Sequence, residues 1–156
     1  MPGLTNYYRH KVLGSIGSGE DVLAIDTWVT LFSVEPSSDG DLNGGPLDAI
    51  EWAPARVAMI REGTVPAETT PRWQRLAGPF GGWQMRNVGT VAWEDAETTA
   101  LPEPTLLVAG GVFDAEVGGN LVAWDFLEQP VQGVPGIRLS IPTEKLVIRL
   151  HKELVT

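Results

Sequence analysis

One segment of the chain has the residue types and the spacing of a cation site. Residues 39–44 read DGDLNG, which places two acidic residues, an asparagine and a glycine at positions one, three, five and six of a calcium-binding loop. The glutamate required at position twelve is missing, because Ile50 stands there and Glu51 comes one residue late. Pro46 also interrupts the loop. We therefore interpret residues 39–44 as a polar hairpin loop rather than a metal site.

Acid–base chemistry needs titratable side chains with distinct roles. Glu94, Asp95 and Glu97 are clustered, but no other group in the sequence would make one of them an acid and another a base. Their spacing is typical of a solvated, charged turn, so a polysaccharide hydrolase acting through carboxylates is the least favoured function. His10 and His151 lie at opposite ends of the chain and are interpreted as surface residues.

Motifs for nucleophilic and cofactor chemistry are absent from the sequence. There is no Gly-x-Ser-x-Gly elbow, no cysteine and no His-Glu-x-x-His pair. Residues 17–19 (GSG) begin like a dinucleotide-binding fingerprint, but no strand pattern precedes them and no third glycine follows in register. We expect no catalytic residue, no cofactor and no metal, and therefore a protein that is not an enzyme.

Composition limits the class of protein and the class of partner. A chain of 156 residues with 43% hydrophobic residues can bury one substantial core. The formal net charge of −9 disfavours nucleic acid and anionic membranes, since both attract basic surfaces. The amino terminus has no secretory apolar region, and no apolar run approaches the roughly 20 residues of a membrane span. We expect a protein made and kept in an aqueous compartment.

The elements that would position any functional residue begin with a helix. Apolar residues recur at helical spacing over residues 4–13, with Thr5 or Asn6 placed to act as the N-cap. Gly14 stands where a left-handed residue commonly ends a helix. The glycine- and serine-rich residues 14–19 then read as a flexible connector.

After the connector the hydrophobic period changes to two, which is the repeat of a strand. We predict strands over residues 27–34, 55–60, 83–93 (as one strand or two), 105–113, 120–127, 137–141 and 145–151. This pattern predicts an all-β fold, an antiparallel sandwich of about eight strands with a short amino-terminal helix. Its spacing fits a jelly roll, although period and turn content do not distinguish a jelly roll from another sandwich or a barrel.

The expected organisation is an arm and one domain. Residues 1–19 form the amino-terminal arm, with the short helix and its connector. Residues 20–156 form a single β-sandwich domain. Within that domain, residues 63–83 carry prolines and no clean period, so they are expected to form a long loop excursion.

Aromatic residues outside the predicted strands are the candidates for protein contacts. Trp73, Phe80 and Trp83 fall in or at the edge of the loop excursion, where exposed aromatic side chains often anchor a partner. The alternative is that the excursion folds back and covers one end of the sandwich. Tyr7 and Tyr8 on the amino-terminal arm are further contact candidates. The tryptophans in predicted strands are assigned to the core: Trp28, Trp93 and Trp124.

Several segments taken together resemble a family of small virion proteins of tailed bacteriophages. In order along the chain they are residues 3–7 (GLTNY), 11–13 (KVL), 28–32 (WVTLF), 35–37 (EPS), 55–58 (ARVA), 111–115 (GVFDA) and 118–121 (GGNL). The last two are the most specific. Their order and spacing cover most of the chain, and the sequence departs from the family's pattern over residues 62–84.

The resemblance implies a structural role in a virus particle. Members of the family look like capsid cement or decoration proteins with a jelly-roll fold, so the implied partners are the major capsid protein and neighbouring copies in a homo-oligomer. The implied location is the exterior of the capsid, after synthesis in the host cytoplasm. Other members are labelled tail fibre proteins. A tail-associated fibre or adhesin that binds a host receptor or glycan is therefore the alternative.

Overall fold

The computed structural model describes residues 3–18, 26–36, 55–61, 70–77, 82–99, 101 and 103–150. Over this part of the chain there are two helices and ten strands. The helices are α1 (Asn6–Gly17) and α2 (Asp95–Thr98). The strands are β1 (Gly3–Leu4), β2 (Thr27–Phe32), β3 (Val57–Met59), β4 (Arg72–Ala77), β5 (Trp83–Val88), β6 (Val91–Trp93), β7 (Thr105–Phe113), β8 (Leu121–Gly133), β9 (Leu139–Ile141) and β10 (Val147–Leu150).

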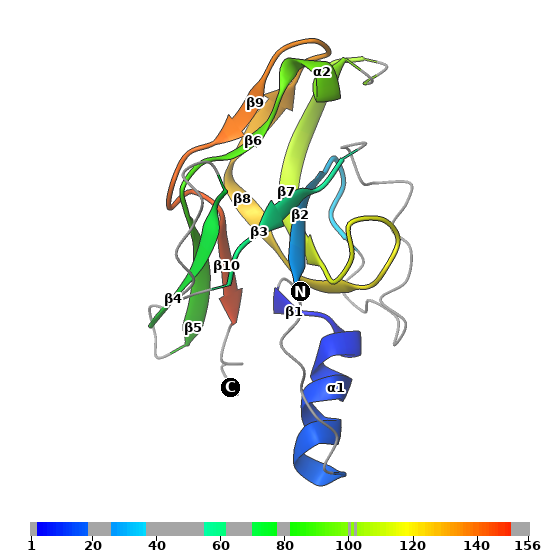
Figure 1. The fold of residues 1–156 in the computed structure, drawn as a ribbon, viewed down its shortest axis with the longest axis vertical. Helices are drawn as coiled ribbons and strands as arrows, with labels where there is room; N and C mark the ends of the chain where they lie inside the picture. Colours follow the sequence, from blue (N-terminus) through cyan, green and yellow to red (C-terminus); the bar gives the residue numbers. More distant parts are fainter. Residues whose placement is uncertain are drawn as a thin grey trace.

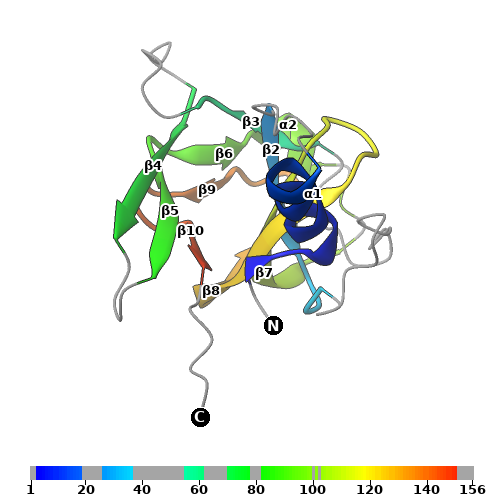
Figure 2. The same ribbon diagram turned by 90° about the horizontal axis from the view of Figure 1, so that it is seen from below.

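The strands form three antiparallel sheets. The largest has the order β1-β8-β7-β2-β3, and the others have the orders β10-β5-β4 and β6-β9. β7 and β8 run the length of the body as a long hairpin, with the three-stranded sheet to one side of it (Figures 1 and 2). The predicted all-β, antiparallel class with a short amino-terminal helix is confirmed. The jelly-roll topology stays a prediction.

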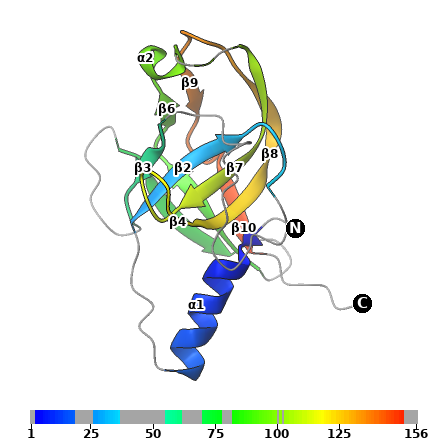
Figure 3. The same cartoon turned by 90° about the vertical axis from the view of Figure 1, so that its right-hand side faces the viewer.

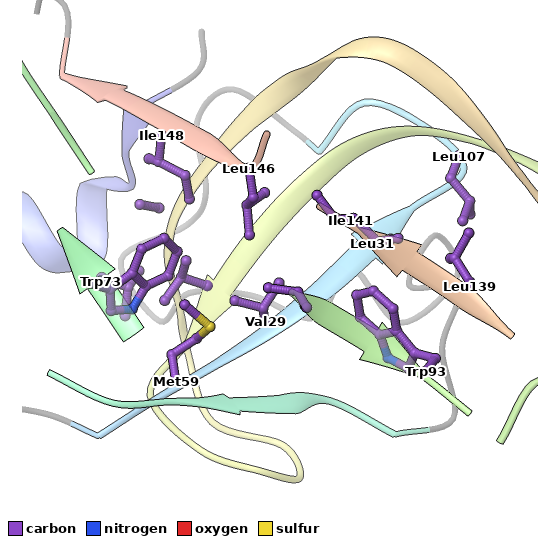
Figure 4. Packing of buried hydrophobic residues seen from close by; sticks show 14 of the residues in the cluster. Val29, Leu31, Met59, Trp73, Trp93, Leu107, Leu139, Ile141, Leu146 and Ile148 are labelled. Carbon is purple, nitrogen blue, oxygen red and sulfur yellow. The ribbon is translucent and has the colours of Figure 1, made fainter. Parts of the chain in front are cut away.

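Both faces of β2, an inner strand of the five-stranded sheet, are buried. On one face Val29 and Leu31 of β2 join the main core, where they lie close to Trp93 and the side chains of the smaller sheets (Figure 4). On the other face Phe32 packs in a second cluster with Phe113 and Trp124. The alternation predicted for residues 27–34 therefore places apolar side chains on both sides of the strand.

Buried polar groups join the elements around the three-stranded sheet. The Asn87 side chain is fully buried; its Nδ2 donates to the carbonyl oxygens of Gly89 (2.7 Å) and Pro142 (3.0 Å), and its Oδ1 accepts from the Leu146 N–H (2.9 Å). The pairing fixes the turn after β5 against the turn that leads into β10. It also gives a partner to both polar atoms of the amide side chain. An unpaired polar atom in a buried site would cost about 1–3 kcal/mol.

A second joint links the two larger sheets. Asp125 of β8 is buried, and its Oδ2 accepts from the backbone N–H of Arg149 in β10 at 3.1 Å. The guanidinium of Arg149 lies 3.4 Å from the same oxygen. A buried carboxylate is tolerated only with such partners, so this pair holds β10 against β8.

The helix differs from its expected limits. Thr5 is the N-cap, as predicted, but the helix continues through Gly14 to Gly17 and closes with the Ser18 N–H donating to the Gly14 carbonyl. The expected ending at Gly14, and with it the connector over residues 14–17, is wrong. Glycine permits the left-handed conformation that ends a helix but does not impose it, and it costs only about 1 kcal/mol inside one.

The expected loop excursion is also wrong over part of its length. Residues 72–77 form β4, which pairs with β5 along its whole length, and Trp73 is buried in the core. The indole Nε1 of Trp73 donates to Thr27 Oγ1 at 3.0 Å. Three of the six residues of β4 are arginine or glutamine, and its apolar residues do not alternate. Cross-strand pairing and one buried tryptophan therefore stabilise this strand. For Trp73 the alternative reading, in which the segment folds back on the sandwich, is the correct one.

Two further expectations concern the acidic residues 94–97 and the loop at residues 39–44. The acidic turn is a short helix, α2, in which the Glu94 and Glu97 side chains form a reciprocal capping box with the backbone. The expected polar loop at 39–44 lies outside the described residues, as do Phe80 and His151.

Substitution of Gly111 by alanine tests the packing of the second cluster, around Phe32. A Cβ at this position would overlap the ring of Phe32 and lie 2.9 Å from a methyl of Leu121. We expect Gly111→Ala to lower the free energy of unfolding by about 1–3 kcal/mol in urea denaturation. The control is Gly17→Ala at the end of α1, where nothing lies within 4 Å of the new Cβ. Equal stability of the two variants would contradict this description of the core.

Candidate protein-contact site

The helix α1 projects from the sandwich instead of packing along it. In Figures 1 and 3 it leaves the body at β1 and points away from both larger sheets. Leu13 and Ile16 are 67% and 78% exposed. With Arg9, which is also exposed, they stand at positions i, i+4 and i+7 and share one side of the helix. We call Arg9, Leu13 and Ile16 the α1 stripe.

Thr5 fastens the base of α1 to the large sheet. Its Oγ1 donates to the carbonyl of Leu121 at 2.6 Å, and its backbone N–H donates to the carbonyl of Val122 at 2.9 Å. The same hydroxyl accepts from the Tyr8 N–H as the helix cap. Because Thr5 is buried, one residue both starts the helix and anchors it to β8.

The predicted contact residues Tyr7 and Tyr8 lie at this base and are half-buried. The Tyr7 hydroxyl donates to Asp114 Oδ2 at 3.3 Å, and Lys11 Nζ lies 5.1 Å from the centre of the Tyr7 ring. Tyr8 packs against the main core. These side chains orient the helix, whereas Arg9, Leu13 and Ile16 of the α1 stripe are exposed.

The loop between β7 and β8 is held rigid beside this base. Asp114 Oδ1 accepts from the Asn120 N–H at 2.6 Å, which closes the loop over residues 114–120. Arg56 Nη1 donates to the carbonyl of Gly118 at 2.6 Å, while its guanidinium stacks 3.6 Å from the centre of the Phe113 ring. Gly118 and Gly119 have positive φ angles, which the closed loop requires. The hydroxyl of Tyr7 therefore donates to a loop that is itself held by hydrogen bonds.

A second exposed aromatic site lies at the end of the three-stranded sheet. Trp83 is 57% exposed at the start of β5, and the guanidinium of Arg75 lies 5.9 Å from the centre of its ring. Tryptophan and arginine are the residue types that most often dominate protein interfaces. The strands of this sheet contain four arginines and no acidic residue: Arg72, Arg75, Arg86 and Arg149.

Two of these arginines are engaged in ion pairs. Arg86 lies 3.2 Å from Glu144, and Arg149 lies between Asp125 and Glu128. On the neighbouring strand β4, Arg75 lies beside Trp83 of β5. We call these last two residues the Trp83–Arg75 pair.

The structure brings together some of the predicted contact residues and separates others. Tyr7 and Tyr8 share the base of α1, Trp83 lies in a different sheet, and Trp73 is in the core. Phe80 lies outside the described residues. Ile16 was missed because it stands in residues 14–19, which were expected to form a connector. Leu13 was missed although it is displaced from the side of the helix that Leu4, Tyr8 and Val12 share. That displacement was the available signal.

The surface pockets of the described region hold little that suggests chemistry. A pocket of about 380 Å³ between β2 and β3 carries the Asp26–Arg61 ion pair, and one of about 350 Å³ carries the Glu94–Arg138 ion pair. Among the residues that the structure describes, no three side chains of the metal-binding types are grouped. No helix in that same part of the chain has the length and apolar character to cross a membrane.

Compared with known proteins, the chain matches no protein-family model and no curated sequence.

Replacing Thr5 by valine tests the anchor of α1. Valine keeps the shape of the side chain and removes the hydroxyl that caps the helix and binds Leu121. We expect Thr5→Val to cost about 1–2 kcal/mol in unfolding free energy and to speed amide hydrogen exchange along α1. Thr105→Val is the matched control, because the Thr105 hydroxyl binds an adjacent loop carbonyl at an exposed site. Unchanged exchange in α1 would show that the helix is held in another way.

Proposed function

We propose that this protein is a structural component of a bacteriophage particle: a cement or decoration protein that binds the outer surface of the head and stabilises the shell. Its partners are the major capsid protein and neighbouring copies of itself. The protein acts by binding and has no catalytic role. It is made in the host cytoplasm and ends on the capsid exterior.

The observation that carries this proposal is the projection of α1 with Leu13 and Ile16 exposed. Large apolar side chains at 67% and 78% exposure on an anchored helix favour a protein partner, since burying each would contribute about 1.5–3 kcal/mol. A rigid sandwich that presents an arm suits a protein that links subunits. The resemblance of residues 111–115 and 118–121 to tailed-phage virion proteins supports the same role.

The distribution of charge also supports binding to protein surfaces. Neither α1 nor the three-stranded sheet contains an acidic residue within its helix or strands, although the chain as a whole carries a net charge of −9. Segments without acidic residues on an otherwise acidic protein can orient it toward acidic neighbours. Many equivalent copies on one particle would need only modest affinity at each contact.

The alternative function is a tail-associated fibre or adhesin that binds a host receptor or glycan. The Trp83–Arg75 pair is the observation that favours it, because an exposed indole offers a flat apolar face to a sugar ring. Binding to a glycan array that is lost in Trp83→Ala would support this alternative over the cement role.

Labelling of intact particles distinguishes the two locations. We expect antibody raised against the protein to decorate the head of the assembled particle, because a cement protein is exposed over the shell. Electron microscopy of labelled particles makes the measurement, with particles lacking the protein as the control. Label confined to the tail would reject the cement role.

Removal of the apolar residues of α1 tests the contact itself. We expect the double variant Leu13→Ser/Ile16→Ser to bind particles that lack this protein at least tenfold more weakly than wild type, since two apolar contacts with the shell or with a neighbouring copy on it are lost. Occupancy is measured by co-sedimentation with particles. Val117→Ser is the control, because Val117 is 87% exposed but lies in the β7–β8 loop. Equal occupancy for all three proteins would remove α1 from the interface.

A further inference from the structure

We propose that the α1 stripe of one copy docks on the α2 end of a second copy, so that the protein associates head to tail. The proposed contact adds detail to the proposed function. It depends on that function only for the claim that copies lie side by side on a particle. The contact between copies is a property of the chain and can be measured in solution.

The donor surface is the α1 stripe. Arg9 gives it a positive charge near the body, and Leu13 and Ile16 extend an apolar surface toward the tip of a helix about 18 Å long. Among the other charged groups of α1, Lys11 lies beside the Tyr7 ring and off the stripe, and His10 flanks Arg9. The stripe therefore needs a partner that combines an apolar residue with acidic ones.

The acceptor surface is the end of the molecule that carries α2 and the turn between β8 and β9. Ile137 is 59% exposed in this turn, where its N–H donates to the Val134 carbonyl at 3.1 Å. The turn lies beside α2, because a Cβ on Gly136 would be 3.9 Å from Thr99 Oγ1. Next to Ile137, the guanidinium of Arg138 lies 3.2 Å from Glu94 of the α2 cap.

Among the acidic residues of α2 and its cap, one carboxylate is without a described side-chain partner. Glu94 is paired with Arg138, and Glu97 is engaged with the Glu94 N–H at 2.6 Å. Asp95 is exposed and has no side-chain bond among those the structure describes. Ile137 and Asp95 together therefore offer the apolar and acidic groups that match Leu13, Ile16 and Arg9.

The positions of the two surfaces determine the kind of assembly. α1 lies at one end of the longest axis of the molecule, and α2 with β9 lies at the other (Figure 1). One copy cannot join its own two ends, so the contact must be made between copies. Because the two surfaces differ, the contact is heterologous and produces a ring if the rotation closes, or a chain if it does not.

Two variants, each lacking one surface, test the proposal in solution. Leu13→Ser/Ile16→Ser removes the donor surface, and Ile137→Ser/Asp95→Asn removes the acceptor. By sedimentation velocity we expect wild type to associate and each variant alone to be monomeric. An equimolar mixture of the two should form a heterodimer and nothing larger, because only one competent donor and one competent acceptor meet. Val117→Ser is the control and should associate as wild type does.

A charge exchange tests the pairing of Arg9 with Asp95. We expect Arg9→Glu to weaken association roughly tenfold and Arg9→Glu combined with Asp95→Lys to restore most of it. Raising the salt concentration should also weaken wild-type association, since exposed charges are screened.

Three results would overturn the head-to-tail contact. They are a monomeric wild type, association of the acceptor-lacking variant alone (as expected if α1 packed against α1), and a mixture that forms no heterodimer. Circular dichroism and thermal unfolding matched to wild type show that a monomeric variant is folded. Particle binding is measured separately. If the wild type is monomeric yet binds heads, the head-to-tail contact fails and the cement role stands.

Discussion

Burial of both faces of β2, inside the five-stranded sheet, is the constraint on which the remaining structure depends. β2 places Val29 and Leu31 in the main core and Phe32 in a second cluster, so neither face can be left to water. The three-stranded and two-stranded sheets supply side chains to the main core. Leu13 and Ile16 on the arm and Ile137 at the far end of the body are among the large apolar residues that this burial leaves exposed.

Polar side chains set how the sheets meet, while apolar burial provides most of the driving force. Asn87 and Asp125 are buried, and each takes backbone N–H groups from segments distant in the sequence. Apolar packing alone would allow the smaller sheet to slide, whereas these bonds have one geometry and a high cost when broken. The Trp83–Arg75 pair is therefore presented from a sheet whose position on the body is fixed.

The sequence predicted what depends on local pattern. The strand over residues 105–113 was found at its observed limits, because its apolar run is bounded by a turn-forming segment. β4 was missed because its pairing with β5, rather than its own composition, makes it a strand. The exposure of Leu13 depends on the direction in which α1 leaves the sheet, and that direction is set by bonds from Thr5 to residues more than a hundred positions away.

The composition of α1 has a thermodynamic consequence for any partner it meets. Twelve residues are close to the shortest helix that is stable alone in water, and this one includes Gly14, Gly17 and Ser15 in its final turns. Its amino-terminal turn is locked by Thr5, but its carboxyl-terminal turns gain little from the sandwich. If a partner binds α1, part of the free energy of binding would go into keeping these turns ordered, which would weaken the contact and speed its dissociation. An assembly built from such contacts can correct misplaced copies before its final arrangement is fixed.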